Sequence, residues 1–278
     1  MTVEENFEIR PFGAERTPEL TAISADVGWN QPATEIGEII RRSGKYLLGA
    51  FRGDALVGAA AAYPYPDGNF AYVNEVIVSS SWRNRGVATK LLTELLPLAA
   101  RDYPVLRLCA TAMGRPIYEK FGFFPFATLS FGELDWSAAA AGPEPSGVAP
   151  LTAADLPEMC ELDAANFGAR RPEVLRGLLS KARDAAWSLR RDGRLAGFII
   201  RASMNWFLQC RDAAAFRDLL RYADARSADG PVPALIRAEH AAQLPVPLEE
   251  HFKLTLMQYG DAFPAPPPAF SGFLPDIG

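Results

Sequence analysis

One stretch of the chain has residues suited to holding phosphate groups: Trp82-Arg83-Asn84-Arg85-Gly86-Val87-Ala88-Thr89. Before it, residues 71–78 are rich in β-branched and aromatic side chains, which predicts a strand. After it, Val87, Leu91 and Leu95 recur at helical spacing. The first N–H groups of a helix have no intrahelical acceptor, and the macrodipole adds partial positive charge. The run therefore predicts an anion site at a helix N terminus.

Residue types within the run favour phosphate as that anion. Gly86 has no Cβ and lets a phosphate approach the backbone, while the small Ala88 leaves the first helical turn open. Arg83 and Arg85 supply charge and forked donors. An exposed basic turn that caps a helix would use the same residues, and so short a run does not by itself separate the two interpretations.

The segment 83–88 resembles the Q/R-x-x-G-x-G/A pattern of the GNAT N-acetyltransferase superfamily, with alanine where glycine is the more usual last residue. The resemblance implies acetyl-coenzyme A (acetyl-CoA) as cosubstrate. It assigns the pyrophosphate to the loop residues Arg83, Asn84, Arg85, Gly86, Val87, Ala88 and Thr89. It also implies that the preceding strand splays from its parallel neighbour, so that the backbone of Val76, Ile77 and Val78 binds the pantetheine arm. A backbone N–H near Val76 would then polarise the thioester carbonyl.

A second resemblance concerns a tyrosine. A strand is expected over residues 105–110, and Pro116-Ile117-Tyr118-Glu119-Lys120-Phe121-Gly122-Phe123 follows it. This segment resembles the family signature in which a tyrosine, one turn before a Gly-Phe pair, lies beside the thioester sulfur. The resemblance implies that Tyr118 protonates the departing thiolate, and a phenol with a pKa of about 10 is protonated at neutral pH. The alternative is a tyrosine that only fills a helix–sheet interface.

The attacking amine must lose a proton, and the nearest candidate base is Glu75, acting directly or through water. Asn74 and Tyr72 are alternatives for ordering that water. Glu75 could instead point away from the ligand or pair with an arginine, because a bulge would change the alternation of side chains along the strand.

A candidate acceptor site lies near the N terminus, where Gly28-Trp29-Asn30-Gln31 leads into an expected helix over residues 35–41. A similar Trp-Asn-Gln element in a group of bacterial GNAT proteins covers the acceptor, which implies acceptor contacts for Trp29 and Asn30. In the alternative interpretation, Trp29 anchors the first helices to the core.

Composition excludes several other classes of function. A net charge of −5 argues against a nucleic-acid surface. The three cysteines are widely spaced and the two histidines lie apart from any Cys or carboxylate cluster, so neither a disulfide framework nor a metal site is expected. The first residues do not read as a signal peptide, and no apolar run is long enough to span a membrane. We therefore expect a cytoplasmic protein with no membrane partner.

The chain contains an internal repeat. Ile9-Arg10-Pro11 corresponds to Val148-Ala149-Pro150, an offset of 139 (150 minus 11), and Gly58 corresponds to Gly197 at the same offset (197 minus 58). Both glycines lie in expected β-hairpins. Residues 137–147 have the small-residue, Gly and Pro composition of a linker. In the second copy, residues 209–215 take the place of the phosphate loop; they lack glycine and include Asp212, which would repel an anion.

These observations predict an α/β (α+β) protein with two GNAT-like domains, each a mixed sheet flanked by helices. Residues 1–138 would form the catalytic domain, and residues 148–278 a degenerate copy without a coenzyme loop. The predicted function is acetyl transfer from acetyl-CoA to a primary amine by direct attack in a ternary complex. A non-catalytic acyl-CoA-binding regulatory module, and a ligase-like transferase resembling mycothiol synthase, are the alternatives. The acceptor, a small-molecule or peptide amine, and the oligomeric state stay open.

Overall fold

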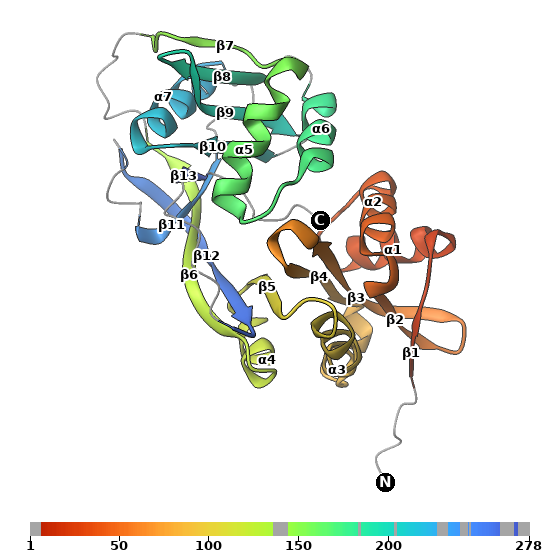
Figure 1. The fold of residues 1–278 in the computed structure, drawn as a ribbon. Coiled ribbons are helices and arrows are strands. Elements are labelled where there is room, and N and C mark those ends of the chain that lie inside the picture. Colours follow the sequence, from red (N-terminus) through yellow and green to blue (C-terminus); the bar gives the residue numbers. More distant parts are fainter. Residues whose placement is uncertain are drawn as a thin grey trace.

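The computed structural model describes residues 7–135, 144–182, 185–202, 205–226, 233–239, 244, 246–261 and 270–271. Helices and strands form two sheets, each with helices packed against it (Figure 1). The architecture is thus α+β, and the first sheet is mixed, as predicted. The prediction of a mixed sheet in each half is wrong for the second sheet, whose strand pairs are all antiparallel among the described residues. The linker predicted over residues 137–147 lies largely outside the described residues. No helix in the described part of the chain is long and apolar enough to cross a membrane.

The first sheet has eight strands in the order β1-β2-β3-β4-β5-β12-β6-β11. Their bounds are β1 Glu8–Pro11, β2 Leu47–Arg52, β3 Ala55–Tyr65, β4 Phe70–Val78, β5 Val105–Ala110, β6 Phe124–Leu134, β11 Pro233–Arg237 and β12 Leu248–Tyr259. Neighbouring strands pair antiparallel except β4 with β5, which pair in parallel. The predicted hairpin and the predicted strands at residues 71–78 and 105–110 are confirmed.

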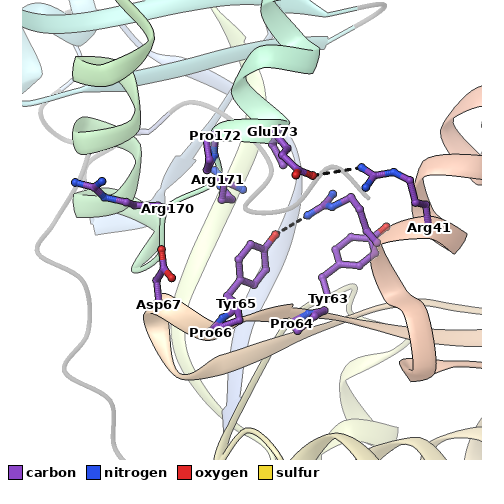
Figure 2. Close-up of a pocket in the computed structure, with 12 residues that line it drawn as sticks. Arg41, Tyr63, Pro64, Tyr65, Pro66, Asp67, Arg170, Arg171, Pro172 and Glu173 are labelled. Atoms are coloured by element: carbon purple, nitrogen blue, oxygen red, sulfur yellow. Dashed lines mark hydrogen bonds and ion pairs between the residues drawn. The ribbon is translucent and has the colours of Figure 1, made fainter.

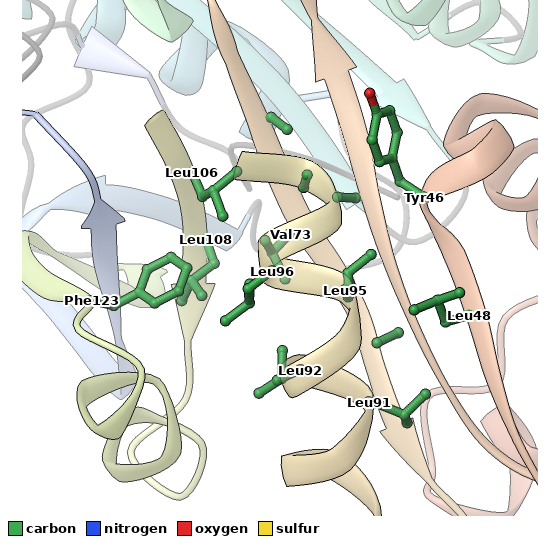
Figure 3. Packing of buried hydrophobic residues seen from close by; sticks show 14 of the residues in the cluster. Tyr46, Leu48, Val73, Leu91, Leu92, Leu95, Leu96, Leu106, Leu108 and Phe123 are labelled. Carbon is green, nitrogen blue, oxygen red and sulfur yellow. The ribbon is translucent and has the colours of Figure 1, made fainter. Parts of the chain in front are cut away.

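Helices cover both faces of this sheet. The helix α3 (Val87–Ala100) packs on one face, and its side chains at 91, 92, 95 and 96 are buried against the strands, as Figure 3 shows. The helices α1 (Thr17–Asp26) and α2 (Ala33–Ser43) pack on the other face. A short helix, α4 (Arg115–Lys120), follows β5. The spacing of leucines predicts α3 correctly because one stripe of the helix faces the core.

Parallel pairing between β4 and β5 is short. It joins Phe70–Tyr72 to Val105–Arg107 and goes no further. Beyond Tyr72, the strand β4 continues towards the loop before α3, and no strand among the described residues pairs with it on its β5 side. The splay between these two strands that the sequence comparison implied is therefore present.

The last long strand of the chain completes the first sheet. The strand β12 inserts between β5 and β6, pairing Thr255–Tyr259 with Leu106–Ala110. Its other edge pairs with β6 along most of its length. In Figure 1 these two strands run side by side from the region of α4 towards the second half. Met257 of β12 is fully buried in the same core as α3, so this core includes both ends of the chain.

The second sheet has the order β13-β10-β9-β8-β7. Its strands are β7 Val148–Pro150, β8 Ala186–Arg191, β9 Arg194–Ala202, β10 Asn205–Cys210 and β13 Phe270–Ser271. The helices α5 (Leu156–Phe167), α6 (Pro172–Lys181) and α7 (Ala213–Asp224) complete this half. From β7 to α7, strands and helices follow one another as they do from β1 to α3.

Two glycines at equivalent positions of the internal repeat have the same role in packing. A Cβ on Gly58 of β3 would lie 2.8 Å from the Ile77 carbonyl and 3.3 Å from Val87 of α3. A Cβ on Gly197 of β9 would lie 3.0 Å from the Gln209 carbonyl and 2.9 Å from Leu219 of α7. In both halves, glycine lets the hairpin approach the strand before the helix and the helix itself.

We predict that Gly58→Ala destabilises the protein by roughly 1–3 kcal/mol, because the added methyl meets backbone that cannot move aside. The control is Gly37→Ala within α2, where no atom lies within 4 Å of the added Cβ. Alanine there should be neutral or stabilising by about 0.5–1 kcal/mol. Urea unfolding of both variants measures this, and equal stabilities would contradict the packing role of Gly58.

Candidate active site

The loop between β4 and α3 presents its backbone to solvent. Arg83, Asn84, Arg85 and Gly86 are exposed. Asn84 and Gly86 have φ values of 60° and 78°, the left-handed region that Asn and Gly adopt most readily. No atom lies within 4 Å of the position of a Cβ on Gly86, so the space in front of it is open.

The N terminus of α3 has no internal cap. Its first backbone hydrogen bond runs from the Lys90 N–H to the Gly86 carbonyl, at 2.9 Å. The N–H groups of Val87, Ala88 and Thr89 precede that bond and have no intrahelical acceptor. No side chain caps this helix in the described part of the chain. Together with the nearby arginines, these groups form a site that can hold a phosphate.

A carboxylate that the sequence analysis did not single out fastens the start of this loop. Asp26, at the end of α1, accepts hydrogen bonds from the Ser80 N–H at 2.6 Å and from the hydroxyls of Ser79 and Ser80. The Ser80 N–H, followed by the hydroxyls of Ser80 and Ser79, lowers the pKa of Asp26. An ionised Asp26 therefore ties α1 to the loop.

Glu75 occupies a β-bulge in β4. The pairing of β3 with β4 shifts between Ala59 and Ala61, and Glu75 has a φ of 47°. Such a conformation is strained for a residue other than glycine. The bulge turns Glu75 towards α1, and only 6% of its surface is exposed.

Burial controls the protonation of Glu75. Its pKa is raised to about 7; removal from water is the largest cause, and the nearby charge of Glu35 also raises it. A hydrogen bond from the Gln31 side-chain amide to Oε1, 2.9 Å long, opposes this shift. The other oxygen, Oε2, has no hydrogen-bond partner among the described residues. Glu75 is thus positioned to exchange a proton near neutral pH.

The partner of Glu75 is a residue that the sequence analysis passed over. Gln31 is itself held by Ser24 of α1, which donates to the Gln31 Oε1 at 2.9 Å and accepts from its backbone N–H at 3.1 Å. The only signal was its place beside Trp29 and Asn30. Trp29 is 50% exposed, which does not fit an anchor to the core. Asn30 bonds locally to the Gly28 carbonyl.

The remaining strand residues divide between the two faces. Val76 and Val78 pack towards α3, whereas Ile77 packs towards α1 and α2. Beside the bulge, neither side-chain amide atom of Asn74 has a hydrogen-bond partner among the described residues. This amide is available to bind a polar ligand or a water molecule.

Tyr118 lies on α4, against the same core as α3 and Val76. Its ring meets that of Phe123 edge-on at 6.0 Å. Burial is the main effect on its hydroxyl and raises its pKa well above the ordinary value, with a smaller contribution from Cys109. Tyr118 therefore keeps its proton at neutral pH. Tyr118 packs against the core on the α3 side of the sheet, whereas the Glu75 carboxylate is bound by Gln31, in the loop between α1 and α2.

The corresponding helix of the second half caps itself. The Asp212 side chain accepts a hydrogen bond from the Ala215 N–H at 2.7 Å, at the N terminus of α7. The carboxylate occupies the place that an anion would take. Across the described residues of both halves, no group of three or more Cys, His, Asp or Glu side chains is arranged to hold a metal ion.

Residues 12–123 match the model of the acetyltransferase (GNAT) family. A search of curated proteins finds no match. Among solved structures, a putative acetyltransferase from Pyrococcus horikoshii is similar with a TM-score of 0.77 and 19% identity, over 98% of this chain and 96% of that chain.

Two further structures are similar over most of this chain. A GCN5-related N-acetyltransferase from Anabaena variabilis has a TM-score of 0.64 and 16% identity, over 91% of this chain and 72% of that chain. One from Sphaerobacter thermophilus has a TM-score of 0.62 and 14% identity, over 91% and 95%. At these identities the structural likeness shows the shared fold.

We predict that Glu75→Gln raises the free energy of unfolding, relative to the wild type, more at pH 8 than at pH 5. The folded-state pKa of about 7 lies above the unfolded value, so the stability that neutral Glu75 contributes is complete below the unfolded pKa. It is lost as pH rises through 7, and glutamine avoids this loss. The gain at pH 8 over that at pH 5 should be roughly 1–3 kcal/mol by urea unfolding. Glu94→Gln, at an exposed position of α3, is the control. A stability difference between Glu75→Gln and the wild type that does not change with pH would refute the raised pKa of Glu75.

Proposed function

We propose that this chain, whose residues 12–123 match the acetyltransferase (GNAT) family, transfers an acetyl group from acetyl-CoA to a primary amine by direct attack in a ternary complex. One observation carries this proposal. The strand β4 holds a buried carboxylate in its bulge and then runs into the uncapped N terminus of α3, where its pairing with β5 has already ended. A proton acceptor and a phosphate site are thus joined by one short strand.

The loop fits the phosphates of the cosubstrate. The N–H groups of Val87, Ala88 and Thr89 would donate to the pyrophosphate, with Arg83 and Arg85 adding charge. Asn84 and Gly86 give the loop its shape, and the space in front of Gly86 admits an oxygen close to the backbone. The backbone of Val76 to Val78 would bind the pantetheine arm along the unpaired side of β4. When bound, acetyl-CoA supplies the activated acetyl group.

Glu75 would act as the base for the incoming ammonium group. A base with a pKa near the working pH is both ionised often enough and basic enough to accept a proton. Gln31 holds one carboxylate oxygen and leaves the other for the amine or an intervening water. Asn74 would orient that water. Trp29 and Asn30, in the loop between α1 and α2, would contact the acceptor.

Tyr118 would protonate the departing thiolate, since burial keeps its phenol neutral. The Val76 N–H would stabilise negative charge on the carbonyl oxygen during attack, an effect commonly worth about 3 kcal/mol. These assignments need no covalent bond between the acetyl group and the protein.

We further propose that residues 1–138 are the catalytic copy and that residues 148–278 are a degenerate second GNAT-like copy, of which β11 and β12 pair within the first sheet. The support is the repeated order of strands and helices, the equivalent roles of Gly58 and Gly197, and the self-capped α7. The second copy would shape the acceptor site without binding coenzyme.

We predict that Tyr118→Phe lowers kcat by roughly 10-fold to 100-fold, because the thiolate leaves without a proton donor. The dissociation constant of acetyl-CoA should stay within about twofold, since the phenol is not among the groups proposed to hold the phosphates. Steady-state kinetics over a panel of amines, with calorimetric titration of acetyl-CoA, measures both. Tyr103→Phe is the control. An unchanged kcat would exclude Tyr118 as the acid, and binding without turnover of any amine would favour the regulatory module.

We predict that kcat/KM falls on the acid side with an apparent pKa of about 7, as Glu75 becomes protonated. Replacing Gln31 by alanine removes the bond that lowers this pKa, so the acid limb should move to higher pH. Thr34→Ala, on exposed α2, should leave it in place. If the pH profile of Gln31→Ala superimposes on that of the wild type, Gln31 does not influence the pKa of the group that titrates.

A further inference from the structure

A hydroxyl group without an assigned part in the reaction lies behind the proposed base. Ser24, on the last turn of α1, is fully buried. Its Oγ accepts a hydrogen bond from the Gln31 N–H at 3.1 Å and donates to the Gln31 Oε1 at 2.9 Å. Gln31 in turn donates from Nε2 to Glu75 at 2.9 Å. Ser24, Gln31 and Glu75 therefore form a continuous chain of hydrogen bonds from α1 to the bulge in β4.

The two ends of the Gln31 amide have opposite effects on Glu75. A half rotation of this amide exchanges Oε1 and Nε2. With Nε2 towards Glu75, the amide donates to the carboxylate and opposes the rise in pKa that burial causes. With Oε1 towards Glu75, the amide could accept a hydrogen bond only from the protonated carboxyl group. The orientation of one side chain therefore decides which form of Glu75 is stabilised.

The Ser24 hydroxyl selects between these two orientations. A hydroxyl group has one proton to donate and two lone pairs that accept. The backbone N–H of Gln31 donates to one lone pair, and the Ser24 proton is directed at Oε1. If the amide turned over, the Ser24 proton would lose this acceptor inside the protein, which is unfavourable. Ser24 thus favours the orientation in which Nε2 faces Glu75.

The backbone path from α1 to Gln31 does not depend on the Ser24 side chain. The Ser24 carbonyl accepts from the Trp29 N–H at 2.9 Å and from the Asn30 N–H at 3.3 Å. Any residue at position 24 offers the same carbonyl. A substitution that removes the hydroxyl therefore changes the bonds to Gln31 and keeps the turn that precedes it.

The helix that follows Gln31 is also held by contacts away from Ser24. The isoleucines of α2 at 36, 39 and 40 are buried in the core that this helix shares with α1. In the last turn of α2, Arg41 pairs with Glu173 of α6 at 3.4 Å (Figure 2). Loss of the Ser24 hydroxyl should therefore leave α2 in place.

Charged groups near Glu75 act independently of the amide. After burial, which is the largest cause, Glu35 in the first turn of α2 also raises the pKa of Glu75. Burial raises the pKa of Glu35 itself, and the charge of Lys181 on α6 opposes that rise. On α1, Asp26 is bound by the loop before α3. In the described part of the chain, none of these three groups is hydrogen-bonded to Gln31, so its amide can turn over while their charges stay in place.

We propose that Ser24 is a positioning residue: its hydroxyl holds the Gln31 amide with Nε2 towards Glu75 and so stabilises the ionised form of that carboxylate. The consequence for turnover rests on the proposed function, in which Glu75 is the base. The consequence for the ionisation of Glu75 does not. A hydroxyl two hydrogen bonds away from the carboxylate thus helps to set the pH range in which Glu75 can accept a proton.

The test is to titrate Glu75 in the full-length protein without substrates, following the ¹³C chemical shift of its side-chain carboxyl group. Glu75→Gln identifies the signal. In Ser24→Ala the amide is free to turn over, and protonated Glu75 can then donate to Oε1. The pKa of Glu75 should therefore rise by about half a unit to one unit. Ser43→Ala is the control, because Ser43 is also buried and donates to the Ile39 carbonyl within α2; this variant should leave the titration unchanged.

Two further measurements separate the amide orientation from a general effect on structure. In Gln31→Ala the pKa of Glu75 should rise, and adding Ser24→Ala should produce no further shift, since Ser24 acts through Gln31. In the pH profile of kcat/KM, the acid limb of Ser24→Ala should move upwards by the same amount as the pKa. At about pH 9 its kcat should stay within about twofold of the wild type, because Glu75 is ionised in both proteins.

The outcomes distinguish this inference from the proposed function. An unchanged pKa of Glu75 in Ser24→Ala, or an equal further shift in the double variant, would overturn the role of Ser24. A raised pKa together with an unmoved acid limb would support that role and refute Glu75 as the base. If Ser24→Ala does not fold, Ser24→Cys decides: its thiol is a weak donor, so the pKa of Glu75 should rise, and an unchanged value overturns the proposal.

Discussion

The early end of the pairing between β4 and β5 is the constraint on which the rest of the structure depends. Three residue pairs join these strands, and beyond them no strand in the described part of the chain pairs with β4 on that side. With so little support from β4, the strand β5 depends on β12 along its other edge. The helix α4, which bears Tyr118, follows β5 directly. The last long strand of the chain therefore supports the site of the first half.

The two halves differ at the N termini of the equivalent helices α3 and α7. The first half leaves the N terminus of α3 uncapped and keeps Glu75 buried in a strained bulge. The second half caps α7 with Asp212. An open helix end and a buried acid both cost stability, and such costs persist where function requires them. This contrast is what we expect if the first half performs the proposed reaction and the second half supports it.

Local patterns predicted most of the first half. The loop before α3 and the strand β4 follow from periodicity and glycine placement, which are set within short segments. Tyr118 was assigned from the resemblance of residues 116–123 to a family signature. Gln31 meets Glu75 across 44 positions, and Asp26 meets Ser79 across 53, so no local pattern could indicate either contact. The insertion of β12 between β5 and β6 could not be predicted for a related reason. The alternation of side chains along β12 is compatible with any neighbouring strand, and the tertiary fold selects β5. The face of the sheet to which the Glu75 side chain points depends on the bulge, and the sequence does not specify the position of that bulge.

The central claim is that the loop from Arg83 to Thr89 holds the phosphates of acetyl-CoA. Calorimetric titration of acetyl-CoA into the wild type, Gly86→Glu and Gly193→Glu tests it most directly. Gly193 is a matched control, since its φ of 76° is close to the 78° of Gly86 and no atom lies within 4 Å of an added Cβ at either position. We expect micromolar binding, about −8 kcal/mol, for the wild type and Gly193→Glu, and none for Gly86→Glu. Equal binding by all three proteins, or no binding by the wild type, would contradict it.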